Sequence, residues 1–419
     1  MLQIKQIDGK TFNEYVRIHE IETPYQTDEY GRTMKAEGYD VLYLGMLDDA
    51  SKLVAATLVL IETKEKIKYA YAPRGFLLEY TNIEVLANFT KLIKAYLGNI
   101  GVMAIKINPL IIRNIYNSNG VLFERNPHYE GIFEAIKKLG YIHMGYNTGF
   151  EAGKPRFEAI ISLNKPYTDL FKEIRKEYRT KIRGAEENFI TVHKSSYKNL
   201  RYLYLQVKNK YPRDLQYFEH LYASFKEEDK IDFFYAKVDT VKFLDSLKQK
   251  HALQDQLCNQ LNKQIYTSTP EEKMVVVSKK MAADNLLNKY KMQMISATKL
   301  LKDRPDGVIA ASALVTKTGD MVYVIMDGMD TSLKAFCAKH LLMWKLVERY
   351  SKLGFKRFNM GGVSDITIPN TLFDGLNQFK MGFNANIFEY MGDLELITNS
   401  GQYFMYENTL MFKNMFKGK

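Results

Sequence analysis

The chain is poor in the residues that build covalent or metal frameworks. It has 2 cysteines, 7 histidines and 1 tryptophan among 419 residues. Cys258 and Cys337 lie in regions of different sequence pattern, which argues against a disulfide framework and fits a reducing compartment. The histidines are scattered singly, and such positions are more often structural or exposed than catalytic. We therefore expect no disulfide scaffold and no metal site.

Long apolar runs are also missing. The longest, residues 53 to 61, is far shorter than the roughly 20 residues that a membrane-spanning helix needs. The first residues, MLQIKQIDGKTF, have the pattern of neither a signal peptide nor a transit peptide. We expect a cytoplasmic protein.

Common catalytic motifs are missing too. The sequence contains no His-Glu-x-x-His, no Cys-x-x-Cys, no Gly-x-x-x-x-Gly-Lys-Ser/Thr and no Gly-x-Ser-x-Gly. Neither a metal, a nicotinamide cofactor nor a nucleoside triphosphate is therefore indicated.

Positive charge is abundant and unevenly distributed. The formal net charge is +11, and residues 165–213 hold thirteen Lys or Arg against five acids. Such a run is more often a solvated helix face than a binding surface. Here the basic positions at 172, 175, 176, 179 and 183 follow helical spacing and cover one broad face. This pattern favours a polyanionic partner, and phosphates are the obvious candidates.

Two regions of the chain follow the same pattern. Residues 41–80, and 233–328 with one segment removed, each read as an apolar strand, a polar turn, a strand starting with two alanines, and a tyrosine-bearing strand. Helical stretches (85–97 and 336–353) and alternating segments (102–110 and 355–363) follow in both copies. A last pair, 138–151 and 378–392, closes the repeat and predicts Lys380 on a strand. The pattern predicts an α/β (α+β) fold made twice.

The segment removed from the second copy has helical periodicity. Between Asp239 and Asp303 apolar residues are spaced by threes and fours on both sides of a polar break, Ser268 to Glu272, which carries Pro270 at a helix-start position. We predict an antiparallel coiled-coil hairpin whose ends lie close together and whose own core is local. A decorative insertion and an arm that touches a partner are equally open.

These patterns divide the chain into three parts. We predict a first domain at 1–160, a second domain at 161–238 and 304–419, and the helical arm at 239–303. The best match is a tandem of acetyltransferase-like (GNAT) folds. The Arg/Gln-x-x-Gly-x-Gly/Ala loop with which such folds bind acetyl-CoA is missing.

Seven segments extend this pattern over nearly the whole chain. They are EYGRTMKAEGYDVLYLG (29–45), YAPRGFLLEY (71–80), INPL (107–110), KKLGYIHMGYNTGF (137–150), RKEYRTKIRGAEENFITV (175–192), FNMGGVSD (358–365) and FKMGFNANIFEYMGDLELITN (379–399). In this order, with the arm interrupting the second domain, the chain resembles the Fem aminoacyltransferases, which build the interpeptide bridge of Gram-positive peptidoglycan. The resemblance implies twin acetyltransferase-like domains around a cleft, with no metal and no coenzyme.

The resemblance also implies a reaction and its partners. An amino acid would pass from aminoacyl-tRNA to the stem-peptide amine of a lipid-linked muropeptide precursor at the inner membrane surface, where homologous bridge-forming enzymes are possible partners. Both substrates are polyanions, which suits a basic cytoplasmic protein that works peripherally at the membrane. An acetyl-CoA-dependent N-acetyltransferase and a non-catalytic tRNA-binding scaffold stay open as alternatives.

Site residues follow from the same resemblance. Lys35 matches a lysine that contacts precursor phosphate, and Arg213 with Tyr217 matches an Arg-x-x-x-Tyr pair at the cleft. Lys380 matches a second-domain lysine that faces the tRNA acceptor end or the reacting carbonyl. Asn108 stands where many relatives have an aspartate considered as a base. Asparagine cannot accept that proton, so we assign Asn108 to substrate binding only.

Overall fold

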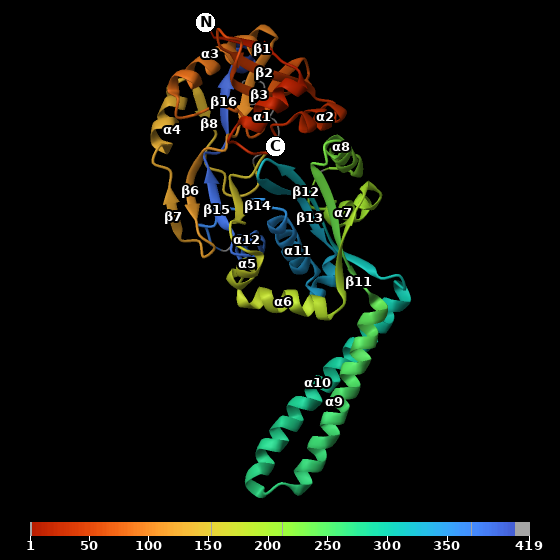
Figure 1. Ribbon diagram of the computed structural model, residues 1–419. Helices are drawn as coiled ribbons and strands as arrows, with labels where there is room; N and C mark the ends of the chain where they lie inside the picture. The colour runs from red at the N-terminus through yellow and green to blue at the C-terminus, as the bar shows by residue number, and fades with distance from the viewer. Residues whose placement is uncertain (1, 152, 212, 370, 407–419) are drawn as a thin grey trace, which may run out of the picture.

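The computed structural model describes residues 2–151, 153–211, 213–369 and 371–406. Two mixed sheets with helices packed against them form the body, and two long helices project from it (Figure 1). The prediction of a mixed α/β fold is confirmed. The predicted domain ranges also include residues 1, 152, 212, 370 and 407–419, which lie outside the described residues.

The first sheet has seven strands, in the order β1-β2-β3-β4-β5-β16-β8. All its neighbouring strands are antiparallel except β4 and β5, which are parallel and are joined through the helix α3. The strands are β1 (Gln3–Gln6), β2 (Asp40–Leu47), β3 (Leu53–Lys64), β4 (Ile67–Ala72), β5 (Val102–Ile107), β8 (Tyr141–His143) and β16 (Leu394–Ile397).

The second sheet has nine strands, in the order β10-β11-β12-β13-β14-β9-β15-β6-β7. It begins with the same succession, because three antiparallel pairings are followed by one parallel pairing, β13 with β14, joined through α11. The strands are β6 (Ile112–Tyr116), β7 (Leu122–Arg125), β9 (Phe157–Ser162), β10 (Ile190–Ser195), β11 (Ile231–Val238), β12 (Val308–Thr318), β13 (Met321–Met329), β14 (Arg357–Val363) and β15 (Asn386–Tyr390).

The two sheets exchange strands. The late strand β16 pairs with β5 and β8 in the first sheet, whereas β6, β7 and β9, all from the first 162 residues, lie in the second. Each sheet therefore depends on both halves of the chain. The division of the chain at residue 160 stays a prediction.

The helices cover the faces of both sheets. Many begin at a side chain that accepts a hydrogen bond from the first turn, among them Thr27, Asn82 and Asp214. They are α1 (Gly9–Ile18), α2 (Asp28–Ala36), α3 (Ile83–Asn99), α4 (Tyr129–Lys138), α5 (Tyr167–Glu173), α6 (Lys176–Glu187), α7 (Leu200–Val207), α8 (Leu215–Lys226), α9 (Thr240–Thr267), α10 (Pro270–Asp303), α11 (Ala338–Lys352) and α12 (Asp374–Met381), with 3-10 turns η1 (Tyr197–Asn199) and η2 (Thr331–Phe336).

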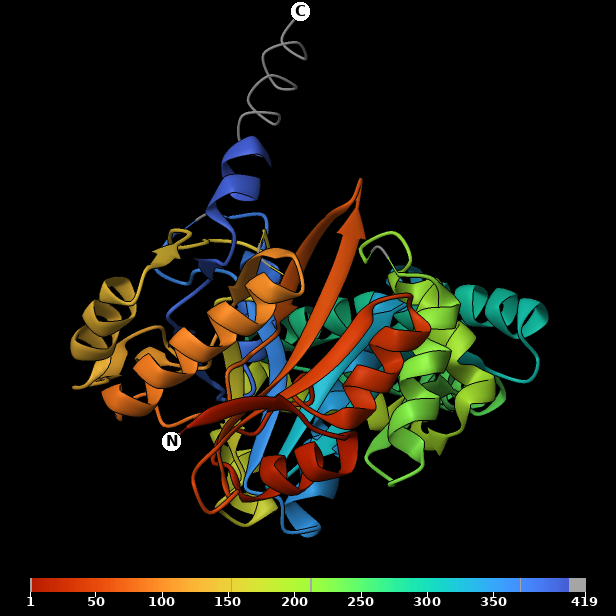
Figure 2. The same ribbon diagram turned by 90° about the horizontal axis from the view of Figure 1, so that it is seen from above.

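A third core joins the two sheets. It contains apolar residues of α1, α2 and β3 together with residues of α7, α8, β11 and β12. The helices α2 and α8 lie side by side at this junction (Figure 2). This shared core holds the site residues of the two halves in a defined arrangement.

The projecting helices α9 and α10 pack along each other (Figure 1). The Thr269 side chain and Glu272 form a capping box at the start of α10, and at the base the Thr240 hydroxyl donates a 2.8 Å hydrogen bond to the Arg304 carbonyl. The far part has a small cluster of its own, formed by Cys258, Leu261 and Ala283. The base belongs to the core of the second sheet instead, through Phe243, Leu244, Leu247 and Ala297. The expectation of an entirely local core is therefore wrong at the base.

The strand predicted at Lys380 is also wrong, because Lys380 lies near the end of the helix α12. Asn377, Lys380 and Met381 are buried, and their spacing of three and four places them on one helix face. The apolar residues on both sides of Lys380, Phe379 and Met381, fit a strand as well as a helix over so short a window. The strand β15 begins only at Asn386.

Candidate functional site

A buried ion pair connects the two sheets at the centre of the molecule. Arg74 follows β4 of the first sheet, and its Nη2 lies 2.6 Å from Oε1 of Glu158 on β9 of the second. Tyr323 donates a 2.6 Å hydrogen bond to the same carboxylate, and Asn359 donates one of 2.8 Å. Burial by itself raises the pKa of Glu158, but Arg74 and these donors outweigh it and hold that pKa below its usual value. Glu158 is therefore a carboxylate anchored between the sheets.

Asn108 holds the loop that carries Arg74. Its Oδ1 accepts a 2.8 Å hydrogen bond from the Arg74 backbone N–H, and its Nδ2 donates one of 2.8 Å to the Tyr71 hydroxyl. The side chain is 2% exposed. Arg74 has a φ of 59°, which only a well-supported non-glycine residue adopts. Asn108 thus positions the central ion pair, and its predicted substrate contact stays a prediction.

A cationic group lies where α2 meets α8. Lys35 is exposed on the last turn of α2. Two residues later, Glu37 accepts from His220 at 2.9 Å and lies 3.7 Å from Arg213. The Arg213 guanidinium is 4.7 Å from the ring centroid of Tyr217, and burial raises the pKa of that tyrosine. The contact between α2 and α8 therefore brings Arg213 and Tyr217 to the helix that carries Lys35.

Lys154 adds a buried amine that the sequence did not indicate. Its Nζ lies 3.2 Å from the ring centroid of Tyr25 and 5.5 Å from that of Tyr30. Burial lowers the pKa of Lys154 well below its usual value, and the positive charges of Arg74 and Arg213 lower it further. Lys154 is therefore close enough to both Arg74 and Arg213 for their charges to act on its amine.

Lys380 lies within electrostatic reach of the central ion pair. It is 6% exposed, and its Nζ donates a 2.7 Å hydrogen bond to the Gly362 carbonyl. Burial lowers the pKa of Lys380 to about 8, and Lys339 lowers it whereas Asp327 and Glu158 raise it. Asp327 itself forms an ion pair with Lys339. At pH 7 Lys380 is therefore mostly an ammonium group that can donate to a developing negative charge.

The strand β14 connects Lys380 to the central pair. The side chain of Asn359, which donates to Glu158, also accepts a 2.7 Å hydrogen bond from the Gly361 N–H. Gly361 has a φ of 80°, and a Cβ there would lie 3.3 Å from the Val324 carbonyl and 3.5 Å from Lys380 Nζ. The positive φ and the close approach to the Val324 carbonyl both favour glycine at this position.

The structure thus brings Arg213 and Tyr217 together beside α2, on which Lys35 is exposed. Lys380 lies apart from them, within electrostatic reach of Glu158. Asn108 holds the loop that carries Arg74. The sequence did not identify Glu158 or Asp327 as site residues, because a carboxylate on an apolar strand shows no signal until its distant partner is known.

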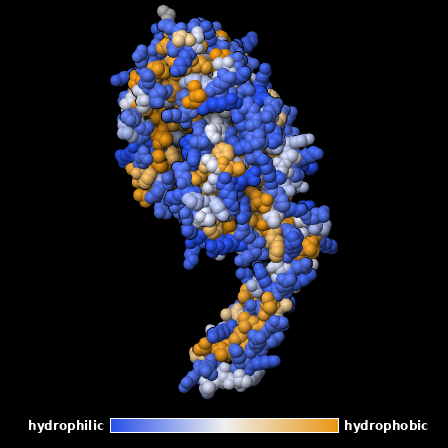
Figure 3. All heavy atoms as spheres, viewed as in Figure 1, coloured by the Kyte–Doolittle hydropathy of each residue, from blue (hydrophilic) through white to orange (hydrophobic). Residues whose placement is uncertain are grey.

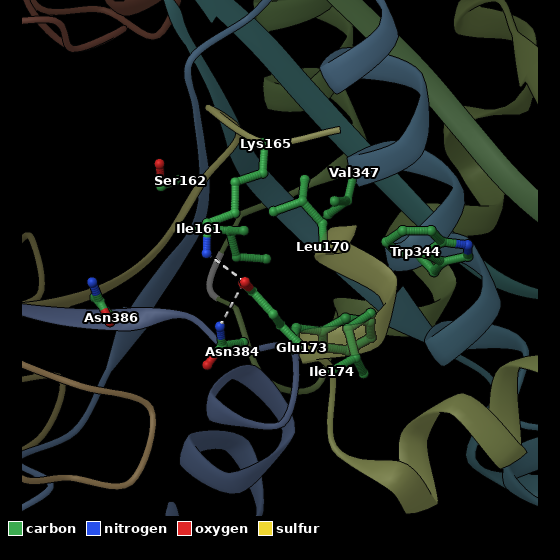
Figure 4. Close-up of a pocket in the computed structure, with 11 residues that line it drawn as sticks. Ile161, Ser162, Lys165, Leu170, Glu173, Ile174, Trp344, Val347, Asn384 and Asn386 are labelled. Atoms are coloured by element: carbon green, nitrogen blue, oxygen red, sulfur yellow. Dashed lines mark hydrogen bonds and ion pairs between the residues drawn. The ribbon is translucent and has the colours of Figure 1, made fainter. Parts of the chain in front are cut away.

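A small pocket lies away from all these residues. It has a volume of about 150 Å³ between β9, α5, α11 and β15, and Glu173 points toward Lys165 and Asn384 at its edge (Figure 4). Asn384 donates to Glu173 at 3.1 Å, and Lys165 forms an ion pair with it. Pockets for cofactors usually measure roughly 300 to 1,000 Å³, so this one is not a candidate cofactor site. Among the described residues no cluster of three or more His, Cys, Asp or Glu could hold a metal ion.

Comparisons with known proteins match this chain to one family over nearly its whole length. The model of the FemAB family matches residues 7–409. Aminoacyltransferase FemA of Staphylococcus epidermidis is 22% identical over 392 residues, which cover 90% of this chain and 92% of that protein. Lipid II:glycine glycyltransferase of the same species is 22% identical over 411 residues, with coverage of 96% and 94%. A crystal structure of FemX superposes with a TM-score of 0.72 at 20% identity, covering 96% of this chain and 99% of that one.

Proposed function

Because the chain belongs to the FemAB family, we propose that it transfers an amino acid from aminoacyl-tRNA to the stem-peptide amine of a lipid-linked peptidoglycan precursor. This reaction builds the interpeptide bridge of the cell wall. The names of its relatives, aminoacyltransferase and lipid II:glycine glycyltransferase, support the transfer and the precursor. The aminoacyl-tRNA donor is part of our proposal.

One observation carries the proposal: two separate groups of basic side chains lie around the buried Arg74–Glu158 pair. Arg213 lies beside α2, on which Lys35 is exposed, and Lys380 with Lys339 forms the other group. An enzyme that joins two anionic substrates needs a separate cationic site for each. We assign the first site to the phosphates of the precursor, where Arg213 can form paired hydrogen bonds, and the second to the donor ester.

The reaction is aminolysis of an ester. The acceptor nitrogen attacks the carbonyl carbon, a C–N bond forms, the C–O ester bond breaks, the terminal RNA hydroxyl leaves, and the nitrogen loses a proton. A lysine-type acceptor with a pKa of roughly 10.4 is neutral in only about one molecule in 10³ near pH 7, a handicap of roughly 4 kcal/mol. Positioning two reactants can contribute roughly 7 to 11 kcal/mol. Alignment of the substrates therefore exceeds the handicap.

Lys380 is our candidate for the catalytic donor. Its ammonium is held by Gly362 and shielded from water, so it needs little reorganisation when negative charge develops on the carbonyl oxygen. Asn108 carries no acidic group, so the proposal assigns no proton transfer to it.

The proposal includes the finer architecture. We infer twin acetyltransferase-like domains at 1–160 and at 161–238 with 304–419, and a coiled-coil arm at 239–303. The repeated order of strand pairings in the two sheets supports the duplication. The structure has no helix, within the described residues, with the length and apolar character to cross a bilayer. We place the protein in the cytoplasm, peripherally at the membrane, on the basis of its positive charge.

A transfer assay tests the function. The protein is incubated with charged total tRNA and lipid-linked precursor, and the mass of the precursor is measured. We expect a gain of one or more amino-acid residues. Lys35→Met and Arg213→Met should each weaken precursor binding by roughly 1 to 3 kcal/mol, as for hydrogen bonds to charged groups, whereas the exposed Lys10→Met should not.

The alternatives give different results in the same experiment. Calorimetric binding of acetyl-CoA with no transfer from tRNA would favour an N-acetyltransferase. Tight tRNA binding with no product in a single turnover would favour a scaffold.

A further inference from the structure

A second cationic surface lies outside the site described above. A groove of about 1000 Å³ runs between α7, the end of β11 and the base of the arm. Its basic side chains outnumber its acidic ones by five to two. They are Lys198, Arg201, Lys210, Lys237 and Arg304, against Asp306 and Asp330.

Within the described part of the chain, none of the five basic side chains of this groove forms an ion pair with a carboxylate. Four of them are exposed, and Lys237 is partly buried. The basic stretch 172–183, predicted from the sequence to cover one helix face, differs in this respect. That prediction is wrong in detail, because the extended backbone at Ile174 and Arg175 divides the stretch between α5 and α6. Lys172 on α5 pairs with Asp169, Arg179 on α6 donates to the Ile174 carbonyl, and Arg183 lies over the Phe171 ring. The groove therefore keeps its positive charge available, whereas this stretch uses much of its own locally.

The lining of the groove suits single-stranded RNA. Tyr202 is 45% exposed at its wall and offers a ring on which a base can stack. Asn199, Gln206 and Asn209 line the same wall and can form hydrogen bonds with bases or sugars. A flat membrane surface would not reach into a recess of this kind, but a flexible nucleotide chain would.

One wall of the groove, α7, packs on the strand that carries an electrostatic partner of Lys380. The packing of α7 on β13 is so close that a Cβ on Gly328 would lie 2.7 Å from the Gln206 Cβ. The residue before Gly328 is Asp327, the ion-pair partner of Lys339. Burial raises the pKa of Asp327, but Lys339, Lys380 and Lys210 together outweigh it and lower that pKa. Lys210 of the groove and Lys380 therefore act on the same carboxylate.

We propose that this groove binds the single-stranded 3′ end of the donor RNA and directs its terminal ester toward Lys380. The inference rests on the proposed function, because it assigns a path to the donor of that reaction. Phosphates would lie along the exposed basic side chains, and a base near the end would stack on Tyr202.

The test measures binding of uncharged tRNA by fluorescence anisotropy at several salt concentrations. The triple variant Lys198→Gln/Arg201→Gln/Lys237→Gln is compared with Lys91→Gln/Lys94→Gln/Lys138→Gln, which removes the same charge from exposed positions on α3 and α4. Each lost phosphate contact to a single strand reduces the salt slope by roughly 0.7, so the groove variant should lose about 2 in slope and at least about tenfold in affinity. The control should bind like the unmodified protein.

Tyr202→Ala separates stacking from charge. We expect weaker tRNA binding with an unchanged salt slope, because no phosphate contact is removed. Equal tRNA affinity in the groove variant and its control would overturn the proposal. A groove variant that keeps tRNA affinity but loses binding to vesicles of anionic lipid would also overturn it, in favour of a membrane contact.

Transfer assays distinguish this proposal from the proposed function. If the unmodified protein transfers an amino acid and the groove variant does so with an unchanged KM for tRNA, RNA binding by the groove is refuted and the proposed function is retained. If no transfer occurs but the groove variant alone loses tRNA binding, RNA binding by the groove is retained and the proposed function is refuted.

Discussion

Lys380 combines burial with positive charge, which makes it unusual among the lysines of this chain. Its ammonium is held against a backbone carbonyl and lies close to Lys339, whose own charge is offset by Asp327. A buried charge of this kind lowers the stability of the folded protein. It can also stabilise a transition state that gains negative charge. Two predictions follow from these opposite effects.

Lys380→Met should reduce turnover much more than precursor binding, because the donor acts mainly in the transition state. Loss of one such donor typically costs roughly 10² to 10³ in rate. Steady-state kinetics with charged tRNA would measure kcat and KM separately. Lys380→Arg should recover only part of the activity, since a planar guanidinium does not replace a compact ammonium. Turnover near the normal rate in a folded Lys380→Met protein would remove Lys380 from the chemistry.

The same substitution should stabilise the fold at neutral pH. The folded pKa of Lys380 is about 8, below its ordinary value of 10.5, so the unfolded chain binds more protons between these values and the wild-type protein gains stability as pH rises through them. The advantage of Lys380→Met in unfolding free energy should therefore shrink by about 2 kcal/mol between roughly pH 7 and pH 9.5. Urea unfolding at both pH values measures it. The exposed Lys10→Met should show no such change, and a pH-independent difference for Lys380→Met would contradict the prediction.

At the scale of elements, the arm consists of two parts with different roles. Its base contributes Phe243, Leu244 and Leu247 to the core of the second sheet, whereas its far part packs only on itself. The far part also exposes apolar side chains, including Leu253, Met274 and Met281, and an apolar stripe is visible along the arm (Figure 3). The far part can therefore change without affecting the body.

Replacing residues 253–284 by a short Gly-Ser turn should leave the unfolding free energy of the body unchanged. Replacing the whole of Asp239–Asp303 should lower it by several kcal/mol, since each buried Leu or Phe side chain contributes roughly 1.5 to 3 kcal/mol. Urea unfolding of the two deletion variants compares them directly. If the far part contacts tRNA, the short deletion should also raise KM for tRNA and leave precursor binding unchanged. Equal stability of both variants would show that the base is as dispensable as the tip.

At the scale of the whole molecule, the sheets are joined by a shared core, by exchanged strands and by the Arg74–Glu158 pair. The pair is buried, so water cannot solvate either charge if the other is removed.

Arg74→Met should therefore cost roughly 3 to 5 kcal/mol in unfolding free energy, because it leaves a buried carboxylate unpaired. The double variant Arg74→Met/Glu158→Leu should recover much of this loss. The exposed pair Arg17–Glu228, 3.2 Å apart, provides the control, and Arg17→Met should cost less than about 1 kcal/mol. Urea unfolding of these three variants and the wild-type protein measures the differences, and adding Glu158→Leu gives the coupling. A cost for Arg74→Met as small as that of the control would show that the junction does not depend on the pair.

The sequence by itself determined the local elements and the family. Alternating and helical periodicity indicated most of the strands, the helices of the arm and the mixed α/β class, because these patterns depend on neighbours within a few residues. The order of short motifs indicated the family and pointed to Lys35, Arg213, Tyr217 and Lys380. The excess of positive charge in residues 165–213 was also evident, but not which of those side chains remain unpaired.

Only the tertiary structure decided how these parts meet. Arg74 and Glu158 are 84 positions apart in the chain, and Lys154 becomes part of the site only through Tyr25 and Tyr30. The exchange of β16 and β9 between the sheets depends on how both halves of the chain pack together. The periodicity of neighbouring residues therefore does not predict it. Lys380 likewise takes its lowered pKa from burial and from Lys339, which are properties of the folded surroundings and not of the residues beside it in the sequence.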